Sequence, residues 1–328
     1  MMRHLIALPL LAAALLWAST SRAAPLEVEV IVFARTINAD SVDEAWPDRQ
    51  QIQRFDSAGL PLGRYPWVPC NTPGITCKLS PLPDQIEPVI TSANVEPQPD
   101  NGIRLLAADQ LKLADARSKL ASQGNYRVLL HTGWQQALAA SRTTALPVRL
   151  IGGRNYGPQF GDDGYQLPPT PPAKPTTDLV GDLQAEAAAE LGQPLITGPA
   201  PRWELDGTLS LYRSGALVVE TSLQWRQPGT VPVRDNGETA TTTASGNDSL
   251  SSGAVKVEGD VQVLAVGDET SNTAPTSSSE PFLFAYPLAQ LRPLKKGETY
   301  YLDHPLYGVI VQVRDGVEAA PAAAPAAP

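Results

Sequence analysis

Two carboxylates in one segment are the first residues whose types suggest chemistry. Asp206 and Glu220 lie on the two strands of an expected hairpin, on the side that alternation turns away from the core. A pair of carboxylates is sufficient for glycoside hydrolysis, so a carboxylate-based hydrolase is one alternative. Solvated acids on a sheet face are far commoner than active sites, however. Because the chain contains no S-x-x-K, G-x-S-x-G or H-E-x-x-H motif, we predict that it is not an enzyme.

The histidines indicate structure rather than catalysis. Only His131 and His304 would remain after removal of an N-terminal leader, and zinc hydrolases typically need two or more nitrogen ligands. Asp303 and Pro305 bracket His304 in a pattern typical of a turn, so we expect this histidine to hydrogen-bond locally. His131 lies in an apolar strand, where we expect it to be partly buried and hydrogen-bonded. We predict no metal site and no other cofactor.

Cys70 and Cys77 enclose a short loop that contains proline and glycine. In an oxidising compartment, such a close pair is typical of a disulfide bond, which is our prediction. Two free thiols are the alternative, and a metal site is a third choice because no histidine is near in the sequence.

The N-terminal residues 1–23 have the three-part pattern of a cleaved signal peptide. Arg3 precedes an apolar run from Leu5 to Ala18, and Ser21-Arg22-Ala23 fits the small-x-small rule for cleavage. The run is 14 residues long and contains a proline, whereas a membrane span needs about 20 residues. We therefore expect export to the periplasm and no membrane span in the mature protein.

Charge and composition exclude one class of partner. The formal net charge is −9, and no basic run is present, so we predict no binding to nucleic acid. The 32 prolines and 25 glycines indicate much irregular chain. We expect a Pro/Gly-rich insertion at about 152–200, a Ser/Thr/Gly-rich insertion at about 227–280, and a disordered Ala/Pro tail at 317–328.

The regular elements in the first half of the chain follow from hydrophobic periodicity. Residues 26–35 and 126–134 read as strands, 148–151 as a short strand, and 105–122 as the one principal helix. Between the first strand and the helix, residues 36–104 read as a long surface excursion. Its aromatic residues either stack on sugar rings or fill the underside of the loop: Trp46, Tyr65 and Trp67.

The clearest hairpin spans residues 203–225, with a turn at Arg213-Ser214-Gly215. Alternation places Trp203 and Leu205 on a core face, with Asp206 and Tyr212 on an exposed face. Residues 282–291, 300–304 and 309–313 supply further strands. Together, these elements predict one α+β domain over 24–316, with a mainly antiparallel sheet, one principal helix and long irregular insertions.

Four segments occur in order along the chain: EVEVIVF, YRVLLHTGW, LDGTLSLYRSGALVVET and YYLDHPLYGVIVQV. They cover roughly a third of the chain, and the hairpin together with the last segment is the most specific part. In this combination, the four segments resemble the CsiV family of periplasmic peptidoglycan-binding proteins.

The resemblance implies an exported protein that binds peptidoglycan and supports its synthesis in cell-wall assembly and cell shape. It implies action with the outer-membrane lipoprotein LpoA, which activates a class A penicillin-binding protein. We expect ligand contacts at Asp206, Tyr212, Arg213 and Glu220. The family motif positions are Leu205, Gly207, Leu209, Leu211, Leu302, Asp303, His304, Pro305, Gly308 and Val309.

Two other functions remain open at this point. An adaptor would dock a periplasmic protein through strand edges or Pro-rich segments and would reach the cell wall only indirectly. A peptidoglycan hydrolase would use the Asp206 and Glu220 carboxylates.

Overall fold

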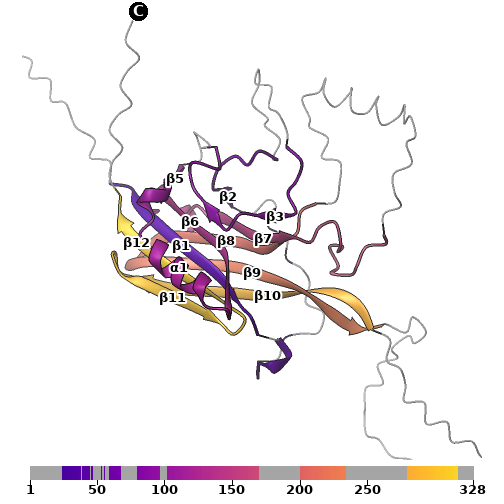
Figure 1. Cartoon of the computed structure of the whole chain (residues 1–328). Helices are drawn as coiled ribbons and strands as arrows, with labels where there is room; N and C mark the ends of the chain where they lie inside the picture. The colour runs from indigo at the N-terminus through magenta and orange to yellow at the C-terminus, as the bar shows by residue number, and fades with distance from the viewer. Residues whose placement is uncertain are drawn as a thin grey trace, which may run out of the picture.

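The computed structural model describes residues 24–37, 39–44, 46, 53, 55, 59–67, 80–96, 102–169, 200–233 and 279–316. Within these ranges, the chain forms one α-helix and two six-stranded sheets, which pack face to face (Figure 1). The expected α+β class is confirmed. The expected single sheet is wrong, because two mixed sheets are present.

The first sheet has the strand order β11-β12-β1-β6-β4, and β5 also pairs with β6. All of its pairings are antiparallel except β4 with β6. Its strands are β1 (Leu26–Arg35), β4 (Val89–Ile90), β5 (Ile103–Leu105), β6 (Tyr126–Gln136), β11 (Thr299–His304) and β12 (Tyr307–Asp315).

The second sheet has the strand order β10-β9-β8-β7-β2, and β3 also pairs with β7. Its long strands pair antiparallel, and β2 runs parallel to β7. Its strands are β2 (Leu60–Pro61), β3 (Gln85–Ile86), β7 (Val148–Asn155), β8 (Trp203–Ser214), β9 (Ala216–Pro232) and β10 (Ser279–Leu294).

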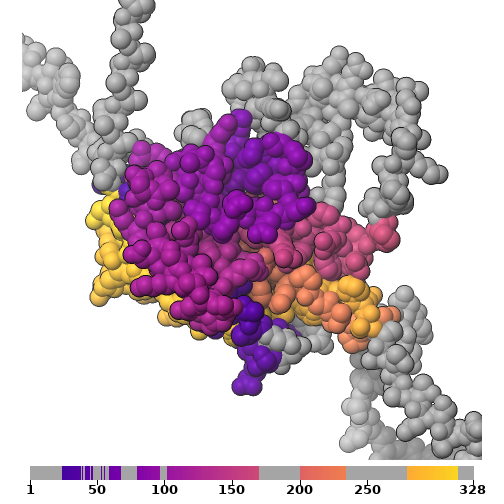
Figure 2. All heavy atoms as spheres, in the orientation of Figure 1, coloured from indigo at the N-terminus to yellow at the C-terminus, as the bar shows by residue number. Residues whose placement is uncertain are grey.

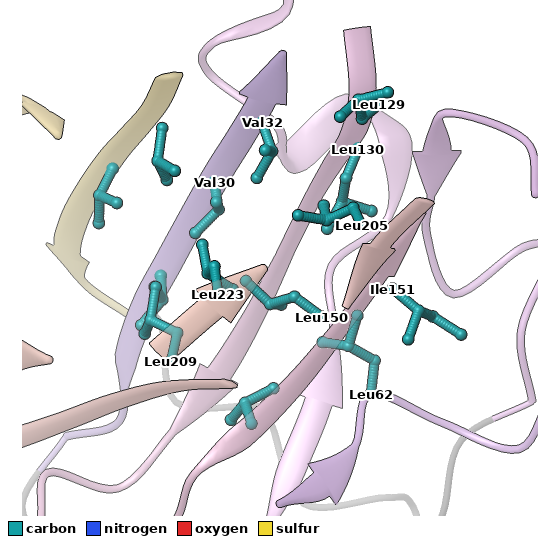
Figure 3. Close-up of a cluster of buried hydrophobic side chains, with 14 of the residues drawn as sticks. Val30, Val32, Leu62, Leu129, Leu130, Leu150, Ile151, Leu205, Leu209 and Leu223 are labelled. Carbon is teal, nitrogen blue, oxygen red and sulfur yellow. The ribbon is translucent and has the colours of Figure 1, made fainter. Parts of the chain in front are cut away.

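One hydrophobic core lies between the two sheets. Val30 and Val32 of β1 point toward the second sheet, where Leu205 and Leu209 of β8 lie (Figure 3). Val28 belongs to the same core cluster, and all five residues are fully buried. Each buried side chain of this size stabilises the fold by about 1.5–3 kcal/mol. The expected core face of the hairpin is confirmed.

Helix α1 (Ala114–Ser122) covers the other face of the first sheet (Figure 1). Leu113, which precedes the helix, and Ala116 and Leu120 within it pack against Ile31 and Phe33 of β1. The helix is shorter than the expected 105–122. The chain continues the sheet up to Leu106, whose N–H bonds to the Gly133 carbonyl. The short 3-10 turn η2 (Ala108–Gln110) then precedes the helix.

The expectation of a surface excursion at 36–104 is wrong for much of its described part. Leu62, Tyr65, Ile86 and Ile90 are buried in the core, and β2 to β5 extend both sheets. A 3-10 turn, η1 (Ala39–Ser41), follows β1. Short apolar segments separated by irregular chain have no period to detect, so this part was not predictable.

The expected insertions begin later than their composition indicated. Strands β9 and β10 pair from Pro232 and Ser279 inward, and β7 continues to Asn155. After β7, Tyr156 and Phe160 pack against β10. A third 3-10 turn, η3 (Arg142–Thr144), lies before β7.

Several expectations concern residues outside the described ranges. These are the leader at 1–23, Cys70 and Cys77, the Pro-rich part after 169, the middle of the Ser/Thr-rich insertion and the tail at 317–328. Among the described helices, none has the length and apolar character needed to cross a membrane.

Candidate functional site

The second sheet turns a polar surface away from the core. We call this surface the hairpin face: Arg149 on β7, Thr208 and Ser210 on β8, and Glu220 and Ser222 on β9. Strand register places Arg149, Thr208 and Ser222 in one row and Ser210 opposite Glu220 in the next. All five residues are partly exposed. The hydroxyls and charges therefore form a polar surface suited to hydrogen bonding.

Glu220 anchors one end of the hairpin face. Its Oε2 accepts hydrogen bonds from Arg142 Nε (2.8 Å) and the Tyr212 hydroxyl (3.1 Å). Arg142 Nη2 also donates to Oε1. The hydrogen bond from Arg142 is the main cause that lowers the pKa of Glu220, so the carboxylate stays charged. The structure thus brings together two expected ligand residues, Tyr212 and Glu220, and adds Arg142.

Asp206 is not on the exposed surface. It is 2% exposed and forms a bidentate pair with Arg149, whose Nε and Nη2 each lie 3.0 Å from a carboxylate oxygen. Arg226 Nη1 lies 3.5 Å from Asp206 Oδ2. The backbone of Gln53 also bonds to this part of the sheet. Its carbonyl accepts a hydrogen bond from Arg226 Nη2, and its N–H donates to Gln224 Oε1. The expected exposure of Asp206 is wrong, because Arg149 and Arg226 pair with its carboxylate and the carboxylate is buried.

The expected pair of neighbouring carboxylates does not form. Asp206 faces Gln224 across the hairpin, whereas Glu220 faces Ser210, four residues further along β8. Four strand residues span about 13 Å. Glycosidase carboxylates are only about 5–9.5 Å apart. These two acids are therefore not placed as a hydrolytic pair.

Arg213 and Tyr212 differ in their exposure at the hairpin tip. Arg213 is exposed, and its backbone N–H donates to the Ala139 carbonyl (3.0 Å). Tyr212 is only 2% exposed, so its expected exposed position is wrong, and its hydroxyl donates to the Glu220 carboxylate. The tip itself is Gly215, whose φ of 69° lies in the left-handed region. Arg213 shares its side of β8 with Leu209 and Leu211, so it is not part of the hairpin face.

The apolar motif positions build the core. The members with fully buried side chains are Leu205, Leu209, Leu211, Leu302 and Val309. Gly207 has a φ of 151°, and an added Cβ would lie 2.2 Å from the Ser222 carbonyl oxygen. The leucines and Val309 therefore fill the core between the two sheets, and Gly207 allows β8 and β9 to approach closely.

The Asp303–His304–Pro305 segment forms the expected turn between β11 and β12. His304 Nδ1 accepts a hydrogen bond from the Leu306 N–H (3.1 Å), which confirms the local role. Trp46 stacks on the His304 ring at 5.6 Å. Burial lowers the pKa of His304 to about 4.

His131 is fully buried beneath helix α1. Its Nε2 lies 2.9 Å from Glu29 Oε1, which confirms the expected hydrogen-bonded role. Within the described ranges, no group of three or more His, Cys, Asp or Glu side chains is placed to hold a metal ion.

The early aromatic residues pack against the body of the protein. Tyr65 is buried and stacks on Trp67 at 4.6 Å, and Trp67 lies 6.0 Å from Trp203. Trp46 meets Tyr286 edge to face at 5.1 Å. Of the two open interpretations, the structure favours core filling.

A second polar cluster was missed by sequence reasoning. Arg35, at the end of β1, donates from Nη2 to Asp303 Oδ1 (2.6 Å) and to the Tyr301 hydroxyl (2.7 Å). The Tyr301 hydroxyl donates to the same Asp303 oxygen (2.6 Å). Alternation along β11 places Tyr301 and Asp303 on one side, but no local signal connects them to Arg35.

Comparison with known proteins identifies the family. The family model described as peptidoglycan-binding protein, CsiV, matches residues 5–315. No curated protein and no solved structure matches the chain. Since the matched region spans nearly the whole sequence, the chain belongs to the CsiV family of peptidoglycan-binding proteins.

Proposed function

We propose that the mature protein is a non-catalytic, periplasmic peptidoglycan-binding factor. The family match over residues 5–315 is the observation that carries this proposal. The exported location rests on the leader pattern at 1–23. The absence of recognised hydrolase motifs and the separation of Asp206 from Glu220 support binding without catalysis.

The hairpin face is the proposed contact surface. Thr208, Ser210 and Ser222 offer hydroxyls that both donate and accept hydrogen bonds. Arg142 and Glu220 add charges that suit the carboxylates and amines of stem peptides. Each contact is solvent-exposed and weak, but a polymeric ligand engages many protein copies and many sites at once.

The proposed role is accessory to peptidoglycan synthesis. By the family resemblance, the partners are the outer-membrane lipoprotein LpoA and the class A penicillin-binding protein that it activates. Binding of the protein to the wall near this lipoprotein would concentrate the synthetic machinery at its substrate.

A pull-down with purified sacculi tests direct binding. The mature protein should sediment with the sacculi at low salt and release no soluble muropeptides. Retention of all the protein in the supernatant would overturn the proposal. Sedimentation only after LpoA is added would support the adaptor function, and released muropeptides would support the hydrolase.

A second measurement tests export. The protein should be recovered from the periplasmic fraction with Ala24 as its first residue. Recovery of an uncleaved chain from the cytosol would contradict the proposed location.

A further inference from the structure

We propose that Tyr301, Arg35 and Asp303 form a subsite for a sugar ring of the peptidoglycan glycan chain. We call these three residues, with Phe33 and Gly308 beneath them, the aromatic subsite. This inference rests on the proposed function and names a ligand group that the hairpin face does not explain.

Tyr301 offers an exposed aromatic surface. At 45% exposure, it is the most exposed aromatic side chain among the described residues. It lies on β11 at the margin of the first sheet, in the C-terminal part that reaches the surface in yellow in Figure 2. An aromatic ring left this open in a well-ordered strand is available for stacking.

The inner side of the Tyr301 ring is already covered. Phe33 lies nearly parallel to it, with ring centroids 6.2 Å apart and planes 10° apart. Between the two strands, a Cβ added at Gly308 would lie 2.6 Å from Tyr301 Cε2 and 2.7 Å from Phe33 Cζ. Because Gly308 has no side chain, both rings can pack directly against its backbone. The exposed area of Tyr301 consequently belongs to its outer side.

Hydrogen bonds hold the Tyr301 ring in one orientation. Its hydroxyl donates to Asp303 and accepts from Arg35, and Arg35 Nη1 also donates to the Pro305 carbonyl (3.0 Å). Burial, followed by the hydrogen bond to Asp303, raises the pKa of Tyr301 to about 12, so the hydroxyl keeps its proton. A ring fixed before binding loses little conformational entropy when a ligand stacks on it.

The polar groups beside the ring match a sugar better than a peptide side chain. The Asp303 side chain is 60% exposed and can accept hydrogen bonds from sugar hydroxyls, while Arg35 is 27% exposed and can donate to ring or amide oxygens. The C–H face of a pyranose is apolar and its edge is polar. This pattern complements an aromatic ring bordered by a carboxylate and a guanidinium.

Peptide-free glycan strands, prepared from sacculi with an amidase, are the probe for this subsite. The full mature protein should bind them, and Tyr301→Ala should weaken the affinity about two- to tenfold, the range expected for loss of one aromatic contact. Tyr301→Leu, which keeps apolar volume without a ring, should show the same loss, whereas Tyr301→Phe should retain most of the affinity. Leu146→Ala removes an exposed apolar side chain elsewhere and should have no effect.

Three outcomes separate the claims, with thermal unfolding confirming that each variant is folded. Unchanged affinity of Tyr301→Leu for glycan strands would overturn the aromatic subsite. Wild-type protein that sediments with intact sacculi but ignores glycan strands would also overturn it, leaving the proposed function intact. Wild-type protein that does not sediment with intact sacculi would defeat the proposed function itself.

Discussion

At the scale of single residues, the buried carboxylate of Glu29 connects several elements. Its oxygens accept hydrogen bonds from the backbone N–H groups of Lys112 and Leu113, and from Arg314 Nη1 at 2.6 Å. Burial alone would raise the pKa of Glu29, but its bonds to His131, Arg314 and the backbone together lower the pKa to about 2. One side chain thereby ties β1 to β6, to β12 and to the start of α1.

Replacing Glu29 by Gln should destabilise the fold by about 3 kcal/mol, because Arg314 loses its charged partner and the helix start loses one acceptor. Urea unfolding at neutral pH measures the change, and Glu87→Gln at an exposed position is the control. The contribution of Glu29 is present above pH 4.5 and is lost as the pH falls through about 2. Equal stability of the two variants would contradict the structural role.

The buried His304 should make the stability of the fold depend on pH in a second, higher pH range. Burial lowers its pKa from 6.5 to about 4, so the unfolded chain takes up a proton first as the pH falls. Stability should therefore be complete above pH 6.5 and decline between 6.5 and 4. In His304→Asn, the amide oxygen can still accept from Leu306, and this decline should be smaller. Thermal unfolding of both proteins between pH 6.5 and pH 4 tests this prediction. If the stability of the two proteins falls equally with pH, the role of His304 is refuted.

At the scale of elements, the β8–β9 hairpin depends on close approach at Gly207. Its φ of 151° and the nearby Ser222 carbonyl leave no room for a Cβ. Gly207→Ala should lower the free energy of unfolding by about 2–5 kcal/mol, because it adds both backbone strain and overpacking. Gly215→Ala is the matched control, since φ there is 69° but no atom lies within 4 Å of an added Cβ. Gly215→Ala should lower the free energy of unfolding by only about 1 kcal/mol. Similar urea midpoints for the two variants would contradict this account.

Strand β10 is a long edge strand that prolines protect. The Leu283 N–H points away from β9, toward the Gly164 carbonyl, so odd-numbered residues turn their N–H outward. Pro281, Pro287 and Pro293 share that parity, and each removes an outward donor. This arrangement keeps the ladder with β9 complete while interrupting the free edge.

Pro287→Val should restore a donor in the middle of this edge and promote pairing between copies of the protein. Size-exclusion chromatography with light scattering should show concentration-dependent dimers or larger species. Pro81→Val, at an exposed position outside both sheets, should remain like the wild type. A monomeric Pro287→Val protein at all concentrations would show that the proline is not what protects the edge.

At the scale of the whole molecule, the two proposed surfaces lie on opposite sides of the sheet pair. The hairpin face is the outer side of the second sheet. Tyr301 pairs with Ile310, which packs on the α1 side of the first sheet. A meshwork ligand can reach both sides, so the affinity for intact sacculi should exceed that for soluble fragments.

Removing hydroxyls from the hairpin face tests its share of this binding. Thr208→Ala with Ser222→Ala eliminates two neighbouring hydroxyls from directly paired residues. Loss of two hydrogen bonds should weaken sacculus binding about tenfold and change the free energy of unfolding little, because both side chains are partly exposed. Sedimentation at several protein concentrations measures this, and undiminished binding would exclude the hairpin face.

Local pattern was enough to locate the principal strands. Alternation defined the hairpin and the start of β1 because side chains on a strand change sides at every residue, and apolar runs indicated the rest of β1 and β6. The turn at His304 was likewise predictable, since Asp and Pro favour turns through their own backbone chemistry. The motif leucines could be assigned to the core for the same reason. Family membership also followed from short segments in order, and it was confirmed over 5–315.

Only the tertiary structure decided what covers each surface. Alternation predicts that Asp206 is exposed, whereas Arg149 and Arg226 pair with its buried carboxylate. Helix α1 begins just after Lys112 and Leu113, whose backbone N–H groups donate to the Glu29 carboxylate. Arg35 and Asp303 are 268 residues apart and meet only because β1 and β11 flank β12. Such contacts join distant segments through packing, and a local pattern carries no information about which distant side chain will arrive.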